Sequence, residues 1–241
     1  MKTIDYIAYT IDRLPKGYVF TYTDFTTEVH QAETVIKTLN RLAVSGKIKK
    51  LSKGKFYKPE QTPFGELKPP QEEVVKDLLK EDGKIIGYLT GYSIYNQLQL
   101  TTQISNLIQI GRNQTRPKLK RGNYTISFVK QKNRITRENI PFLQVLDALR
   151  YIKKIPDAPI DFVCKRFLAI LGAYQEKELM SMVQLSLKYP PSTRALLGAI
   201  LDELGKDNWT KPLYDSLNPV TKYKLAGAEE ALSTTEKWRI V

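Results

Sequence analysis

The hydrophobic pattern of the first sixty residues predicts three helices and a short strand. Apolar side chains recur at helical spacing over residues 3–14, and this helix must end before Pro15. Residues 17–22 predict a short aromatic strand, and Thr23 can cap a second short helix through Phe25. A third helix over residues 31–45, stopped by Gly46, is the most regular. Its predicted core face consists of Ala32, Val35, Ile36, Leu39, Leu42 and Ala43.

Residues 47–59, KIKKLSKGKFYKP, predict a two-stranded ribbon directly after the third helix. The turn falls at residues 52–54, where Gly54 can supply a positive φ. We expect at least one of Phe56 and Tyr57 to anchor the ribbon on the core, since adjacent residues point to opposite faces of a strand. Helix, strand, two helices and a ribbon is the order of a winged helix-turn-helix.

The rest of the chain predicts an α/β region that passes into helices. Residues 61–70 continue a Pro-rich stretch that we interpret as a linker, so we divide the chain into domains 1–60 and 71–241. After it come a helix over 71–83 with Gly83 as its stop, strands over 84–91, 105–111 and 124–130, and a short helix over 92–100. Four helices follow from Ile140 onward. The expected fold class is α+β, with an N-terminal winged helix-turn-helix and a helical C-terminal part.

The distribution of charge along the chain indicates the kind of partner that it binds. The 241 residues carry a formal net charge of +13, and the excess is concentrated in two places. Residues 1–60 hold 11 Lys and Arg against 6 Asp and Glu, and residues 111–137 hold 9 against none. The C-terminal part from residue 138 is nearly neutral. Two positive islands on a balanced chain favour a polyanionic partner.

In the first island, the third helix presents Thr34, Lys37 and Arg41 on its outer face, flanked by Gln31 and Thr38. In a winged helix this face enters the major groove of DNA, while ribbon lysines such as Lys50, Lys53 and Lys55 reach phosphates. The alternatives are ordinary surface residues and a winged helix that binds protein instead of nucleic acid.

The second island brackets a predicted strand and is a candidate phosphate-binding surface for DNA or RNA. The alternative is a sheet edge protected by cations, although nine uncompensated charges exceed that need. Its candidate residues are Arg112, Arg116, Lys118, Lys120, Arg121, Lys130, Lys132 and Arg134, with Arg137 at the end.

Catalysis finds little support in the sequence. His30 is the only histidine and Cys164, within an apolar stretch, the only cysteine, which excludes a disulfide framework and a Cys/His zinc cluster. We therefore expect no catalytic residue, metal or cofactor, and no enzyme. A nuclease-like phage-defence protein remains an alternative. No apolar run approaches a membrane span and residues 1–14 lack a signal-peptide core, so we expect a cytoplasmic protein.

The stretch AETVIKTLNRLAVSGKIKKLSKGKFYKP resembles the N-terminal module of the abortive-infection type IV antitoxin family (AbiEi-like antitoxins). GYLTGYSIYNQLQLTTQ and RPKLKRGNYTISFVK are similar to the start of that family's second domain, and YPPSTRALLGAILDELG and SLNPVTKYKLAG to a bacterial subgroup. The long helical C-terminus departs from a minimal antitoxin.

This resemblance implies an autorepressor that binds inverted repeats in its own operator, with double-stranded DNA as one partner. It also implies an antitoxin that counteracts a nucleotidyltransferase-type toxin. The DNA-facing residues that it implies are Gln31, Thr34, Lys37, Thr38, Arg41, Lys50, Lys53 and Lys55.

Overall fold

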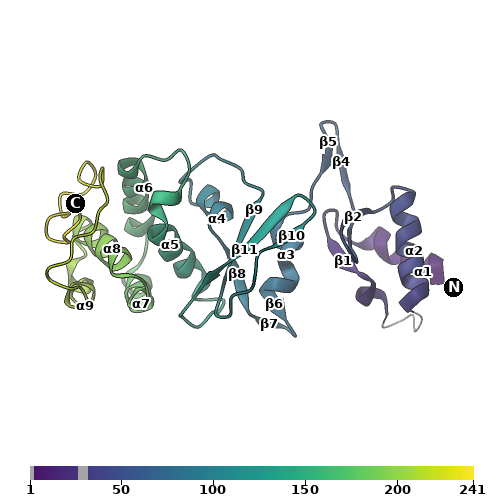
Figure 1. Cartoon of the computed structure of the whole chain (residues 1–241), viewed down its shortest axis with the longest axis horizontal. Coiled ribbons are helices and arrows are strands. Elements are labelled where there is room, and N and C mark those ends of the chain that lie inside the picture. The colour runs from purple at the N-terminus through teal and green to yellow at the C-terminus, as the bar shows by residue number, and fades with distance from the viewer. Residues whose placement is uncertain (1–2, 27–31) are drawn as a thin grey trace. The chain divides into compact units, whose positions relative to one another are not determined.

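The computed structural model describes residues 3–26 and 32–241, and the chain divides into two compact units (Figure 1). Unit 1 comprises residues 1–77 and 119–124, and unit 2 comprises residues 78–118 and 125–241. The division falls within the helix that follows the Pro-rich stretch. The fold is a mixture of helices and small sheets, so the predicted α+β class is confirmed.

Up to Tyr57, unit 1 has the predicted order of elements, and β1, β3 and β2 form an antiparallel sheet in that order. Its core consists of apolar side chains from helices and strands together, including Ile11, Phe20 and Leu39, all completely buried. The elements are α1 (Thr3–Arg13), β1 (Val19–Thr21), the 3-10 helix η1 (Tyr22–Phe25), α2 (Ala32–Val44), β2 (Lys49–Ser52), β3 (Lys55–Tyr57), β4 (Glu60–Thr62), β5 (Gly65–Leu67), most of α3 (Gln71–Leu79) and β10 (Leu119–Arg121).

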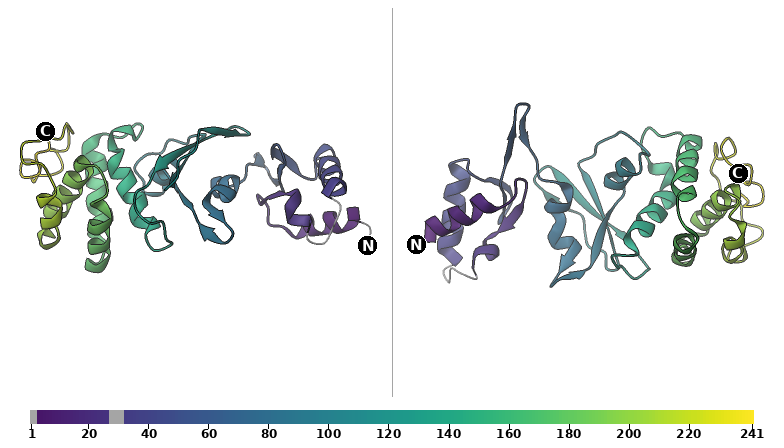
Figure 2. Two further views of the ribbon diagram at one scale, coloured as in Figure 1. Left: turned by 60° about the horizontal axis from the view of Figure 1, so that its bottom comes forward. Right: turned by 180° about the vertical axis from the view of Figure 1, so that it is seen from behind.

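The Pro-rich stretch is a β-hairpin rather than an irregular linker. Strands β4 and β5 pair antiparallel around a turn at Pro63 and Phe64, and Gly65 has a φ of +112°. Thr62 Oγ1 donates to the Gly65 carbonyl at 2.8 Å and accepts from the Phe64 amide at 3.2 Å, which closes the turn. The hairpin projects from unit 1 in Figure 1 and in the right-hand view of Figure 2.

Unit 2 begins with a small mixed sheet. Strand β9 pairs parallel with β11 and antiparallel with β8, in the positions that the sequence predicts. Helix α3 ends before Gly83, which instead occupies the turn of the β6–β7 hairpin with a φ of +73°. The elements are β6 (Lys80–Glu81), β7 (Lys84–Ile85), β8 (Gly87–Thr90), α4 (Tyr92–Gln97), β9 (Leu107–Arg112) and β11 (Tyr124–Lys130).

The four predicted helices of unit 2 are present, and a further short helix over Lys211–Asp215 follows them. Helix α5 packs on β8 and on α7 and α8, and α8 contacts α6 and α9 (Figure 2). The elements are α5 (Ile140–Arg150), η2 (Ile152–Lys154), α6 (Ile160–Gly172), α7 (Glu176–Ser186), α8 (Pro191–Glu203), η3 (Asp207–Trp209) and α9 (Lys211–Asp215). In the described part of the chain, no helix has the length and apolar character needed to cross a bilayer.

A buried polar network joins the sheet of unit 2 to its helices. The carboxylate of Asp147 in α5 accepts hydrogen bonds from Tyr88 Oη (2.7 Å), Thr90 Oγ1 (2.9 Å) and Tyr189 Oη (2.9 Å). Gln131 Nε2 donates to both tyrosine hydroxyl groups at 2.8 Å. Burial raises the pKa of Asp147, although these hydrogen bonds oppose the shift. Buried polar groups with this many partners fix a unique packing.

Candidate nucleic-acid interface

Helix α2 buries Val35 and Leu39 in the core of unit 1 and presents Lys37 and Arg41 to solvent. The buried face is turned relative to the sequence prediction: Thr38 is only 3% exposed, whereas Ile36 is 41% exposed. Thr38 is therefore corrected from a candidate DNA contact to a core residue, because its neighbours on the helix pack against α1 and η1. Thr34 is half-buried. Gln31 and His30 lie outside the described residues.

The β2–β3 ribbon has the predicted turn, with Gly54 at a φ of +73°. Phe56 and Tyr57 are both buried, which confirms that the aromatic residues anchor the ribbon. Strand register assigns the lysines of β2 to two faces, because residues directly opposite each other point to the same side. Lys50 is opposite Phe56, on the face that meets the helical core, and Lys49 is opposite Tyr57 on the other face.

Ion pairs separate the lysines of residues 47–59 into two groups. Lys47 Nζ lies 2.9 Å from Asp12 Oδ2, and Lys49 Nζ lies 3.4 Å from Glu66 Oε2. Glu66 also accepts a hydrogen bond from Tyr57 Oη at 2.7 Å, and this bond is the largest cause that lowers the pKa of Glu66. These ion pairs hold the lysines at the base of the ribbon.

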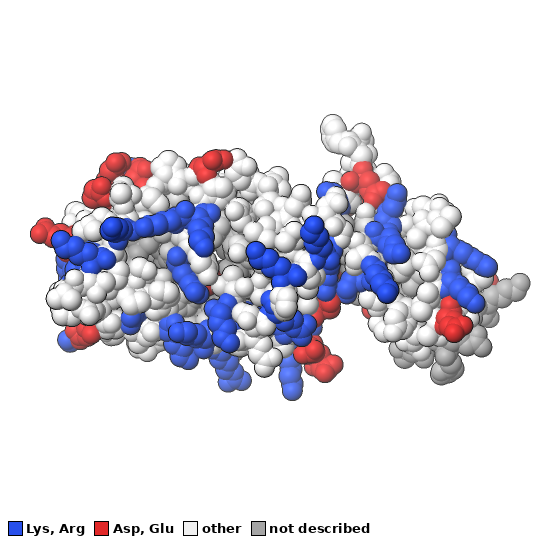
Figure 3. Space-filling view, viewed as in Figure 1, with Lys and Arg blue, Asp and Glu red and all other residues white. Residues whose placement is uncertain are grey.

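Lys58 also belongs to this held group, since its ammonium donates to the main-chain carbonyls of Asp12 and Leu14 at 2.6 and 2.9 Å. By contrast, four exposed cations of α2 and the ribbon have no carboxylate within 4 Å among the residues that the structure describes. These four are Lys37, Arg41, Lys50 and Lys53. We term them the free cations of unit 1, a name that leaves aside Lys68 and Lys120, which lie outside α2 and the ribbon. In Figure 3, basic side chains lie over both the strands and the helices of unit 1.

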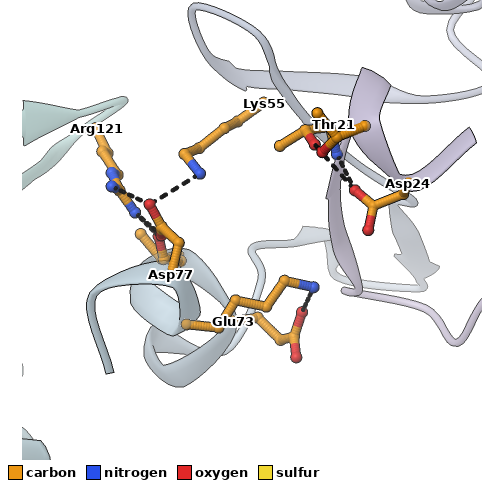
Figure 4. A network of polar contacts seen from close by, with 9 residues as sticks. Thr21, Asp24, Lys55, Glu73, Asp77 and Arg121 are labelled. Carbon is orange, nitrogen blue, oxygen red and sulfur yellow. Dashed lines mark hydrogen bonds and ion pairs between the residues drawn. The ribbon is translucent and has the colours of Figure 1, made fainter. Parts of the chain in front are cut away.

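Lys55 belongs with the held lysines, contrary to the sequence prediction. Its ammonium lies 3.1 Å from Asp77 Oδ2, and its side chain is only 19% exposed (Figure 4). Arg121 donates to both carboxylate oxygens of Asp77, with Nη2 at 2.8 Å from Oδ2, and to the Val74 carbonyl. Burial acts to raise the pKa of Asp77, but the two cations outweigh it and lower that pKa. Lys55 is thus a structural link between β3 and α3.

The second basic island has two of its candidate residues in the interior. Arg112 is 5% exposed and Arg121 is 8% exposed, so neither presents its charge to a polyanion. Burial lowers the pKa of Arg112, and the charge of Arg116 adds to that effect. The exposed members are Arg116, Lys118, Lys120, Lys130, Lys132, Arg134 and Arg137. They are divided between the two units, with Lys120 in unit 1.

Neither a reactive cysteine nor a metal site is found among the described residues. Cys164 is buried, and burial raises the pKa of its thiol to about 12. The described residues contain no group of three or more His, Cys, Asp or Glu side chains that could hold a metal ion. Sequence reasoning missed the pairing of Asp77 with Arg121, because 44 residues separate them and no local pattern joins them.

Comparison with known proteins identifies a family without a described activity. A family model described as "Family of unknown function (DUF6088)" matches residues 6–179. No curated protein matches the chain. A crystal structure of the RV2827C protein from Mycobacterium tuberculosis is similar at 16% identity and a TM-score of 0.47, covering 93% of this chain and 84% of that one. A likeness this distant adds nothing to the assignment of function.

Proposed function

This chain belongs to DUF6088, a family of unknown function, and we propose that it is a DNA-binding regulator whose unit 1 is a winged helix. In this proposal α2 enters the major groove of duplex DNA and the β2–β3 ribbon is the wing on the adjacent backbone. The observation that carries the proposal is the set of free cations of unit 1, of which two lie on α2 and two on the ribbon.

The arrangement of unit 1 supports this assignment in two ways. Helix α2 packs one face on α1 and η1 and leaves a face with Lys37 and Arg41 uncovered, although Ile36 is exposed as well. The ribbon begins four residues after α2 ends. Lys50 of the ribbon lies opposite Phe56, and therefore on the same side of the sheet as the helices. Cations without carboxylate partners are available to neutralise phosphates, and each neutralised phosphate releases counterions.

The biological role that we propose is that of an autorepressing antitoxin. It rests on the resemblance to AbiEi-like antitoxins, whose implied partners are operator inverted repeats and a nucleotidyltransferase-type toxin. The effect on the toxin can be functional without direct binding. Co-expression with the product of the neighbouring gene tests this role: a harmless neighbour, or a failure of this chain to rescue growth, would exclude it.

DNA binding itself is tested by a gel shift with the DNA upstream of the gene. We expect a sequence-selective complex that weakens as salt rises, and about tenfold or greater loss of specific affinity in a Lys37→Ala, Arg41→Ala variant. The control is Lys165→Ala, Lys211→Ala, which removes the same charge from ion-paired lysines of unit 2. A folded protein with no selective shift would favour the protein-binding adaptor, and degradation of the probe would favour the nuclease.

A further inference from the structure

Unit 2 contains a cavity of about 500 Å³ that is lined by five cationic side chains and by no carboxylate. The five residues, which we term the cationic pocket, are Lys130, Lys132, Arg150, Lys188 and Arg194. They come from the end of β11, the residues just after it, the end of α5, the α7–α8 connection and the first turn of α8, and these elements can be followed in Figure 1. Convergence of separate chain segments makes this a feature of the fold rather than of one basic stretch.

The charges of the cationic pocket have no direct ion-pair partner in the part of the chain that the structure describes. Among the described residues, none of the five lies within 4 Å of an Asp or Glu oxygen. Lys130 Nζ donates to the Asn113 carbonyl at 2.6 Å, while Arg194 Nε is buried without a hydrogen-bond partner. Like charges gathered in a concave site raise the local concentration of anions.

The floor of the pocket is formed by Gln131 and Tyr189, whose polar groups already have hydrogen-bond partners within the protein. Gln131 and Tyr189 line the cavity, and both belong to the hydrogen-bonded network around Asp147. Asn133 fixes the other end of the Gln131 amide, through its main-chain N–H at 2.8 Å and its side-chain amide at 3.1 Å from Oε1. The Asp147 carboxylate lies behind this floor, where the charge of Arg150 acts on it. A fixed floor lowers the ordering cost of binding.

The first turn of α8 adds to the positive potential. Pro191 and Arg194 of this 13-residue helix line the cavity, and the N-terminal end of a helix carries partial positive charge. Two prolines, Pro190 and Pro191, restrict the backbone at this end of the helix. The helix end supplements the cationic side chains and is not the basis of the site.

We infer that the cationic pocket is a binding site for a polyphosphate group, such as that of a nucleoside triphosphate. A volume of about 500 Å³ is in the range of small-molecule sites. Five cations match the several negative charges of a di- or triphosphate better than those of a single phosphate or carboxylate. This inference goes beyond the proposed DNA-binding function, since it concerns unit 2 alone.

The test is calorimetric titration of the full chain at low ionic strength with inorganic triphosphate and, separately, with ATP. We expect one-to-one binding of both, weakened about tenfold or more by Lys132→Ala, Lys188→Ala. Both side chains are exposed, so their removal leaves the core intact. The control Lys165→Ala, Lys211→Ala removes equal charge from the same unit and should change affinity less than about twofold.

Each outcome decides the inference. Equal affinity for the two probes assigns recognition to the polyphosphate alone, and tighter binding of ATP adds a contribution of the nucleoside; both support the site. Absence of binding, equal losses of affinity in the pocket and control variants, or binding of duplex DNA alone through Lys132 and Lys188 would overturn it. A Lys37→Ala, Arg41→Ala variant should bind triphosphate normally, so failure of the DNA-binding proposal remains distinguishable.

Discussion

Lys55 and Asp77 form an ion pair of 3.1 Å that ties β3 of the ribbon to α3. The same carboxylate holds Arg121, whose side chain is 9% exposed. A lysine in the middle of a basic stretch is thereby a structural link, whereas Lys50 and Lys53, shortly before it in the sequence, have no carboxylate partner among the described residues. The distinction between held and free lysines separates a binding role from a folding role, and it can be measured.

Replacement of the free lysines should affect DNA binding, whereas replacement of the held Lys55 should affect stability. For Lys50→Ala, Lys53→Ala we expect the salt dependence of DNA binding to flatten by a slope of about 0.9 for each phosphate that these lysines neutralise. Stability should hardly change, because both side chains are exposed. Lys55→Ala should keep the slope and reduce stability instead. Gel shifts over a salt series measure the slopes, and an equal flattening in both variants would contradict the distinction.

Removal of the Asp77 carboxylate should destabilise unit 1. Asp77→Ala leaves the buried guanidinium of Arg121 with the Val74 carbonyl alone, which costs about 1–3 kcal/mol. Amide hydrogen exchange in β1 and β3 reports this unit separately. Asp12→Ala, which removes the exposed Lys47–Asp12 pair of the same unit, is the control and should cost at most about 1 kcal/mol.

The effect of Asp77→Ala should also depend on pH. Because the pKa of Asp77 is held below its ordinary value, its stabilisation is present above the ordinary carboxyl pKa and is lost as pH falls through the folded pKa. Faster exchange in the variant should therefore be evident at neutral pH and fade in acid. A difference that persists unchanged in acid would indicate that packing, not the ion pair, is responsible.

The sequence predicted the main helices of unit 2 and the elements of unit 1 from α1 to β3 because local signals agree there. Between Ile140 and Glu203, helical periodicity coincides with Pro and Gly at the ends, and core positions such as Leu146 and Leu197 are buried as the pattern requires. The ribbon was predictable for the same reason, since Gly54 marks a turn between two short segments that each contain two apolar residues.

Features that depend on residues far apart in the sequence could not be predicted. The outer face of α2 was misjudged at Ile36 and Thr38 because the exact rotation of a helix is set by what packs on it. The β4–β5 hairpin was missed although Pro63 and Gly65 are turn residues, since four prolines in residues 59–70 also describe a linker. The cationic pocket joins residues from 130 to 194, which only the tertiary fold brings together.

Asp147 should make the stability of unit 2 depend on pH in the opposite direction to Asp77. Its pKa is raised by burial, so as pH rises through the ordinary carboxyl value the unfolded chain loses its proton first and unfolding becomes easier. The decrease in stability ends above the folded pKa. It amounts to about 1.4 kcal/mol for each pH unit by which the pKa of Asp147 in the folded protein exceeds that in the unfolded chain.

Asp147→Asn removes this dependence while keeping the shape of the side chain. The amide oxygen can still accept from Tyr88 and Thr90, and Tyr189 Oη can turn to the Leu143 carbonyl, 3.4 Å away. Urea unfolding followed by tryptophan fluorescence reports unit 2, which contains both tryptophans. The stability of the wild type relative to the variant should fall as pH rises above the ordinary carboxyl value, and a rise would contradict the raised pKa.

Gly198→Ala should destabilise unit 2 because α8 meets Trp238 at this glycine without room for a side chain. A Cβ at Gly198 would overlap Cη2 of the completely buried indole. That ring is held in place by a 2.7 Å hydrogen bond from its Nε1 to Asp202, so it cannot easily withdraw. Overpacking of this kind costs about 1–3 kcal/mol.

The matched control for Gly198→Ala is Gly172→Ala at the end of α6, where the new Cβ would meet only Leu204 at an ordinary 3.6 Å. Replacement of glycine by alanine within a helix otherwise favours folding by up to about 1 kcal/mol, so the control should be neutral or stabilising. Thermal unfolding followed by tryptophan fluorescence should show a lower midpoint for Gly198→Ala alone. Equal midpoints for the two variants would mean that the C-terminal segment does not depend on the packing of Trp238 against α8.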